Sequence, residues 1–153
     1  MMRKWMIGVL TVTVLCGPVH AALRDGVGFP QNAFARTLPE LVNTYGAPDA
    51  THGDTYVWTN RDGTILWSFT YPDRNGYPTQ VGHGTRFATH QDSVRGFLAA
   101  CELVYNQVGV KGQTMERSDG NPSVKYRIRA GGSTLVTLFR DTHMVAINTF
   151  AEE

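Results

Sequence analysis

The sequence predicts an α+β fold in which antiparallel strands, in one sheet or more, pack one face against two helices. Two stretches carry helix-capping signals followed by apolar residues spaced three and four apart. The remaining ordered stretches alternate apolar and polar residues between turns rich in Gly, Asn and Asp, which is typical of hairpin strands. Helices and strands are thus separated along the chain.

The first helix is predicted over residues 37–45. Thr37 and Glu40 match a capping box, in which each side chain bonds the backbone amide of the other residue. Pro39 is tolerated in a first helical turn because its missing amide would have had no partner there. Gly46 ends the helix.

A hairpin follows the first helix. Its strands are predicted over 54–60 and 64–71, and a looser third strand over 78–87. Strand parity assigns the faces whatever the length of the turn, because successive side chains point to opposite sides. One side is largely aromatic: Tyr56, Trp58, Ile65, Trp67, Phe69 and Tyr71.

The second half of the chain has the same order. Thr89 and Asp92 match a second capping box, which opens a helix over 90–108 that ends before Gly109. Its apolar stripe is Val94, Phe97, Leu98, Cys101, Val104, Tyr105 and Val108. Three strands are predicted over 123–130, 134–140 and 143–150.

A helix followed by three strands therefore occurs twice along the chain. One interpretation is that the chain consists of two tandem repeats. The halves would be 37–87 and 89–150. At an offset of 70 residues, Tyr56 aligns with Tyr126 and Ile65 with Leu135. Two amphipathic hairpins would also agree to this extent by chance, so both interpretations stay open.

The amino-terminal segment has the features of a cleavable secretory signal peptide. Cationic Arg3 and Lys4 precede an apolar run over 5–16, and small residues at Val19 and Ala21 suit a signal peptidase that cuts after Ala21. We therefore expect a signal peptide over 1–21 and a periplasmic or secreted protein.

Two alternatives to cleavage follow from the same segment. An uncleaved anchor is disfavoured because the apolar run is shorter than the roughly 20 residues that span a membrane. A lipoprotein signal ending at Cys16 is disfavoured because Leu15 stands where a small residue should precede the cysteine. We expect no stable membrane span after cleavage, and one α+β domain over 22–153.

Charge and cysteine content restrict the partners of that domain. The chain has 14 Lys and Arg against 13 Asp and Glu. Loss of residues 1–21 takes away Arg3 and Lys4 and leaves a formal charge of about −1, which disfavours nucleic-acid and membrane-surface binding. Cys101 is the one cysteine within 22–153, so no intramolecular disulfide is expected.

No familiar catalytic, metal-binding or nucleotide-binding motif occurs in the sequence. The histidines of the mature chain are His52, His83, His90 and His143, with no pair at the helical spacing of a metal site. Cys101 lies on a predicted apolar stripe, which favours an inert thiol. We predict no cofactor, no metal and no enzymatic activity; the alternative is a small hydrolase using His52 or His83 with Asp54 or Asp92.

Two surfaces are candidates for binding. The aromatic side of the first hairpin is either core or a recognition surface, and Trp58, Trp67 and Tyr71 would bind a partner if it is exposed. The apolar stripe of the first helix needs a partner, which favours the core.

The second surface is a row of cations. Lys125, Arg127 and Arg129 recur on one side of a predicted strand, and Arg140 joins them from the next strand. Such a row could bind an acidic protein, a phosphate or a polyanion. The alternative is a solvated edge strand that uses charge to prevent unwanted pairing.

The segment 37–49, followed by Tyr56, Trp58, Leu66 and Phe69, resembles the helix, Gly-x-Pro and β-meander pattern of small bacterial envelope proteins. It is similar to the SmpA/OmlA outer-membrane assembly lipoproteins and to the β-lactamase inhibitor protein fold, which has two tandem helix-plus-sheet repeats. The resemblance implies a non-enzymatic protein that docks another envelope protein through a concave sheet.

Together these observations favour an exported protein-binding module of the inhibitor, immunity or envelope-assembly type. Its expected partner is another envelope or secreted protein. A small-ligand carrier lined by the aromatic side, and the hydrolase described above, are the alternatives.

Overall fold

The computed structural model describes residues 30–151, and the predicted signal peptide lies outside them. In chain order the elements are η2 (Ala33–Ala35), α3 (Leu38–Tyr45), β1 (Ala50–His52), β2 (Thr55–Thr59), β3 (Ile65–Thr70), β4 (Gln80–Arg86), α4 (His90–Val108), β5 (Gln113–Met115), β6 (Ser123–Arg127), β7 (Ser133–Phe139) and β8 (Met144–Phe150). Every predicted helix and strand is present. The short elements η2, β1 and β5 were not predicted.

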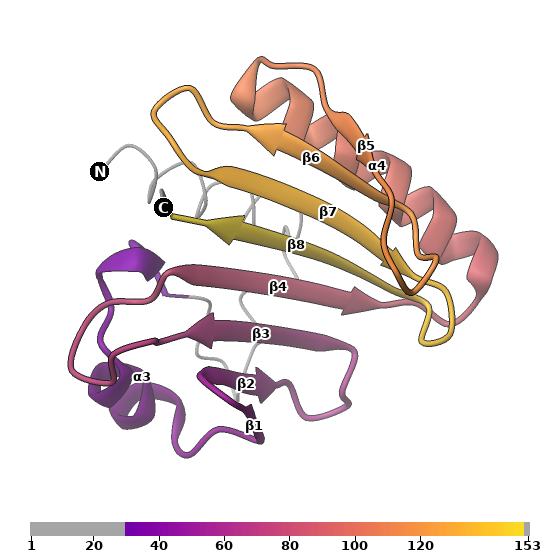
Figure 1. Cartoon of the computed structure of the whole chain (residues 1–153). Helices are drawn as coiled ribbons and strands as arrows, with labels where there is room; N and C mark the ends of the chain where they lie inside the picture. The colour runs from indigo at the N-terminus through magenta and orange to yellow at the C-terminus, as the bar shows by residue number, and fades with distance from the viewer. Residues whose placement is uncertain (1–29, 152–153) are drawn as a thin grey trace.

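The strands form one eight-stranded antiparallel sheet in the order β1-β2-β3-β4-β8-β7-β6-β5 (Figure 1). Its two central strands, β4 and β8, are far apart in the sequence and pair from Gln80↔Phe150 to Arg86↔Met144. In each half of the chain the strands therefore run from an outer edge of the sheet to its centre. The predicted α+β class with an antiparallel sheet is confirmed.

Helix α3 begins with the predicted capping box. The Thr37 hydroxyl accepts a hydrogen bond from the Glu40 amide at 3.4 Å, and a Glu40 carboxylate oxygen accepts one from the Thr37 amide at 3.2 Å. The helix packs on the sheet through Leu41 and Tyr45, whose ring lies edge-on to Trp67 with centroids 5.5 Å apart. Burial raises the pKa of Tyr45 to about 12.

Helix α4 contacts β6, β7 and β8. The Thr89 hydroxyl accepts from the Asp92 amide at 3.1 Å, but the return bond of a capping box is not formed. The helix buries Ser93, Phe97, Ala100, Val104 and Val108. The predicted stripe was therefore too wide: Leu98 is 61% exposed and Tyr105 49% exposed, because the sheet contacts a neighbouring face of the helix.

Both helices lie on the same side of the sheet, and that side forms the core. The aromatic side of the first hairpin faces α3, as parity predicted, and makes up the first core cluster with η2 and Val81. The second core cluster lies between α4 and strands β6 to β8. Cross-strand partners share a face, so the pairs Phe69↔Val81, Val81↔Thr149 and Thr149↔Thr134 trace one continuous buried side.

Residues that align at an offset of 70 positions do not occupy equivalent places in the two halves of the sheet. Tyr56 and Tyr126 both face the helices. Ile65 is also on the helix side, whereas Leu135 pairs with Lys125 and Asn148 on the opposite side. Because one residue of slip reverses every side chain, the aligned hairpins present different faces to the core.

Candidate binding face

No helix of the described residues 30–151 lies over the side of the sheet away from α3 and α4, and we call this side the open face. Its residues alternate with the core residues along every strand. Each cross-strand row can be read from the register; one such row runs Thr55, Thr70, Gln80, Phe150, Ser133 and Arg127. The open face is thus a continuous surface built from strands of both halves.

The charged side chains that the described strands place on the open face are all cations. Within the described strands this face carries no Asp or Glu, while it carries Arg86, Lys125 and Arg127. The whole chain is close to neutral, with 14 basic and 13 acidic residues, so the acids lie elsewhere. This separation gives the open face a positive potential although the net charge is small.

A polar row crosses the open face at the end of the sheet where Gln80 pairs with Phe150. The Thr55 and Thr70 hydroxyls are 2.8 Å apart, and the Thr70 hydroxyl donates to the Gln80 side-chain carbonyl at 3.1 Å. The Gln80 amide then donates to the Asn148 side-chain carbonyl at 2.9 Å. These side chains fix one another in place, so this end of the face is an ordered polar surface.

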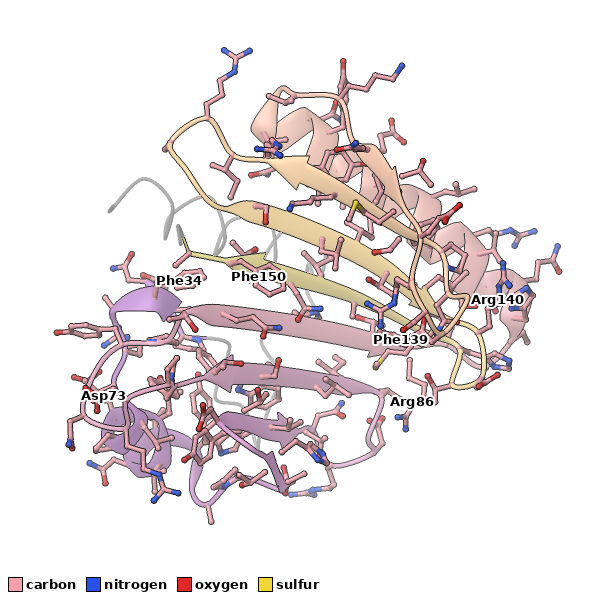
Figure 2. All side chains as sticks on the ribbon, viewed as in Figure 1. Phe34, Asp73, Arg86, Phe139, Arg140 and Phe150 are labelled. Carbon is pink, nitrogen blue, oxygen red and sulfur yellow. The ribbon has the colours of Figure 1, made fainter. Side chains whose placement is uncertain are left out.

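A cavity of about 370 Å³ opens beside this row, on the half of the face formed by β5 to β8. It is lined by Met115, Lys125, Arg127, Gly132, Ser133, Leu135, Phe150 and Ala151. Figure 2 shows Phe150 at one end of the central strands, with Arg86 and Phe139 at the other end. The cavity therefore occupies one end of the open face and combines cations with apolar side chains.

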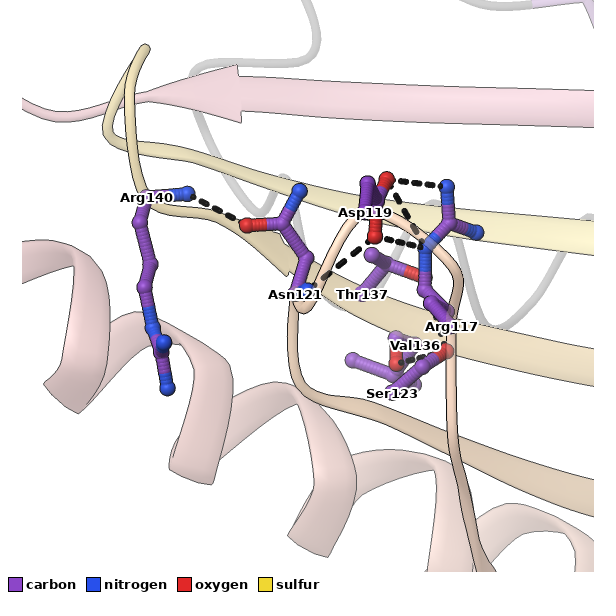
Figure 3. Close-up of polar contacts among 7 residues, drawn as sticks. All are labelled: Arg117, Asp119, Asn121, Ser123, Val136, Thr137 and Arg140. Atoms are coloured by element: carbon purple, nitrogen blue, oxygen red, sulfur yellow. Dashed lines mark hydrogen bonds and ion pairs between the residues drawn. The ribbon is translucent and has the colours of Figure 1, made fainter.

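The other end of the face is closed by the loop between β5 and β6 (Figure 3). The Arg117 guanidinium donates from Nη2 to the Asp119 carboxylate at 2.8 Å and lies 5.3 Å from the centre of the Phe139 ring. Hydrogen bonds from the Arg117 side chain, and then from the Asn121 amide, hold the pKa of Asp119 well below its usual range. This cation already has a partner within the loop.

The aromatic residues predicted as binding candidates do not reach the surface. Trp58 and Trp67 are fully buried and Tyr71 is 1% exposed, all within the first core cluster. The Tyr71 hydroxyl donates to the Arg36 carbonyl at 2.7 Å, which ties β3 to the chain before α3. A direct contact between these residues and a partner is therefore ruled out by their packing, and the core interpretation applies.

The four cations that were predicted to form one row lie in different parts of the structure. Lys125 and Arg127 lie on the open face and line the cavity. Arg129 lies beyond the end of β6 in the turn before β7, because the strand stops at Arg127. Arg140 follows β7 at the end of that strand opposite Ser133, the partner of Arg127.

Sequence analysis missed the apolar part of the cavity, formed by Met115, Leu135 and Phe150. A signal was present for Leu135, since alternation places it on the side opposite Val136 and thus away from a helix. Phe150 and Met115 join it through the register of β7 with β8 and through β5. Neither the register of β7 with β8 nor the pairing of β5 with β6 can be predicted from one sequence.

The histidines and the cysteine occupy unrelated places. His83 is 1% exposed on the core side, His52 lies on the edge strand β1, and the rings of His90 and His143 are 6.1 Å apart near the start of α4. Among residues 30–151 no group of three or more potential metal ligands occurs. Burial raises the pKa of the Cys101 thiol, which disfavours the nucleophilic thiolate.

No known protein family, curated protein or solved structure matches the chain. Within residues 30–151 no helix is both long enough and apolar enough to cross a membrane.

Proposed function

We propose that this chain is an exported protein-binding module that contacts another envelope or secreted protein through the open face. The observation that carries the proposal is a broad sheet face that no helix of residues 30–151 covers. Its described strands carry no carboxylate, although the total charge of the chain is balanced. Charge separation of this kind favours and orients an acidic partner. The secretory features of residues 1–21 support export.

The partner class remains the one expected from the sequence: a target of an inhibitor, of an immunity-type protein or of an envelope assembly factor. The resemblance to the SmpA/OmlA lipoproteins and the β-lactamase inhibitor protein fold supports docking through a sheet. A rigid antiparallel sheet suits recognition by surface complementarity, because its ordered side chains lose little freedom on binding.

Small-ligand binding is a second candidate, and the cavity at Lys125 and Arg127 favours it. Its volume of about 370 Å³ lies near the lower end of the roughly 300–1,000 Å³ range of ligand pockets. The lining has no His, Cys, Asp or Glu, so it offers no general base or thiol nucleophile for the hydrolase alternative.

We further propose that the two halves, 37–87 and 89–150, are tandem copies of one helix-plus-strands unit. Each half starts with a helix capped by a threonine and places its strands from an edge of the sheet to the centre. A duplicated unit would account for this order. The changed register of β7 relative to β3 would then be a later divergence.

The function is tested by affinity capture from envelope extracts, using the exported protein as bait. The expected result is one stoichiometric protein that is lost with Arg86→Glu and Arg127→Glu, which reverse charges on the open face. Arg95→Glu is the matched control, because Arg95 is exposed on α4, away from that face. An empty eluate, or a partner released equally by Arg95→Glu, would contradict binding through the open face.

A further inference from the structure

The cavity on the open face has a cationic wall and an apolar wall. Lys125 and Arg127 project from β6, and each is directly paired across the sheet with a residue of β7, Leu135 and Ser133 respectively. Phe150 of β8 pairs with Ser133 and continues the row. Directly paired side chains lie about 5 Å apart at their Cβ atoms, so both walls border the same space.

Within residues 30–151, no carboxylate balances the positive charges of this cavity. Neither Lys125 nor Arg127 forms an ion pair within the described residues, and no carboxylate lines the cavity. Lys125 is also half-buried, and a cation that is partly removed from water without a counter-charge is unfavourable. An anion placed here would gain charge-assisted hydrogen bonds from both side chains.

The apolar wall specifies the rest of the ligand. Met115, Leu135 and Phe150 contribute flexible and aromatic surfaces that suit burial of another apolar side chain. The cavity is open to solvent on one side, and its volume of about 370 Å³ holds one large side chain with adjoining groups. Charge and apolar surface occur together here. At the opposite end of the face, where Arg86 also lies, Arg117 is already paired with Asp119.

We propose that this cavity receives an aromatic or aliphatic side chain of the protein partner that is flanked by carboxylates. This inference rests on the proposed function and deepens it by naming the partner's chemistry. The apolar side chain inserts between Leu135 and Phe150, and the flanking carboxylates pair with Lys125 and Arg127. The cavity is the anchor point, and the polar row beside it provides the surrounding contact surface.

The probe is a blocked pentapeptide, Glu-Asp-Phe-Glu-Asp, titrated into the protein purified from cells that express the full chain. Backbone amide shifts measured by NMR are expected to change around Lys125, Leu135 and Phe150. A neutral peptide, Gln-Asn-Phe-Gln-Asn, keeps the phenyl group and removes the charges. We expect it to bind about ten-fold more weakly, because paired charges at such sites contribute on that scale.

Substitutions distinguish binding in the cavity from binding elsewhere on the open face. Lys125→Gln with Arg127→Gln should weaken binding of the acidic peptide about ten-fold or more. Arg129→Gln, which removes one positive charge just outside the cavity, should change it less than about two-fold. Unchanged amide shifts away from the substitutions establish that the variants fold.

Several outcomes would overturn the inference: equal binding of the neutral peptide, shifts confined to the outer face of α4, or tighter binding of decanoate, which would indicate a small amphiphile. Failure of the proposed function is distinguishable. If a captured partner depends on Arg86 but tolerates both glutamines in the cavity, binding through the open face stands and the anchor assignment fails.

Discussion

At the scale of single residues, two neighbouring tryptophans show how far the sequence determines the core. Trp58 and Trp67 are direct cross-strand partners on the helix side, as strand parity predicted. Their polar atoms differ in a way that the sequence did not reveal. The Trp58 indole donates to the Gly46 carbonyl at 3.0 Å, whereas the buried Trp67 indole nitrogen has no hydrogen-bond partner in the described structure.

This difference predicts unequal effects of the same substitution. Trp58→Phe removes the hydrogen bond to the Gly46 carbonyl. Because Gly46 is exposed, water can replace the lost donor, so the cost is about 0.5–1.5 kcal/mol beyond the lost packing. Trp67→Phe removes an N–H group that is already buried without a partner, which partly offsets the lost packing. We expect Trp58→Phe to lower the free energy of unfolding by about 1 kcal/mol more than Trp67→Phe does.

Urea denaturation followed by circular dichroism measures both variants against the parent protein. Equal losses of stability, or a larger loss for Trp67→Phe, would mean that the hydrogen bond at the end of α3 contributes nothing measurable.

At the scale of elements, the sequence predicted long elements well and short ones poorly. Capping signals at Thr37 and Thr89 located both helix starts, because the cap bonds are local. The three-residue strands β1 and β5 were missed, since each depends on pairing with a longer neighbour and is too short to show alternation. The buried face of α4 was assigned too widely because its apolar residues extend around the helix, and the position of the sheet selects among them.

In the segment joining α4 to β5, Gly112 packs so closely against β6 that there is no room for a larger side chain. A Cβ atom at this position would lie 2.5 Å from Val124 and 2.6 Å from the ring of Tyr126, which is buried and donates its hydroxyl to the Cys101 carbonyl. Because Tyr126 is held at both ends, it cannot move aside freely. Gly112→Ala is therefore expected to destabilise the fold by about 1–3 kcal/mol through overpacking.

Gly76→Ala is the matched control, because its new Cβ would meet Asp73 at an ordinary 3.5 Å and the backbone there is not left-handed. We expect its thermal midpoint to stay near that of the parent. Gly112→Ala should lower the midpoint by several degrees, at about 4 °C per kcal/mol for a domain of this size. A Gly112→Ala protein as stable as the Gly76→Ala protein would show that β6 adjusts without strain.

At the scale of the whole molecule, the open face depends on relationships that one sequence cannot give. The sequence identified Lys125 and Arg127 as one-sided cations, but it could not show that Leu135 and Phe150 lie beside them. That arrangement requires the order and register of β6, β7 and β8. That Arg86 of the first half shares this face with Lys125 and Arg127 of the second also appears only when strands from both halves are placed side by side.

The same pairing predicts how the molecule unfolds. Its two core clusters lie on one sheet and are joined by the central pairing of β4 with β8, which runs the full length of both strands. Trp58 and Trp67 belong to the first cluster, whereas α4, the longer helix, packs on the second. Tryptophan fluorescence therefore reports on one cluster and helical circular dichroism mainly on the other.

If the central pairing couples the clusters, both signals should show a single urea transition with midpoints that agree within about 0.2 M. Leu138→Ala, a truncation in the second cluster, should then lower both midpoints equally, with a loss of about 2–5 kcal/mol. A fluorescence transition that stays in place while the helical signal shifts would show that the halves unfold separately. The prediction of one domain over 22–153 would then be wrong, because each half would hold its own core without the other.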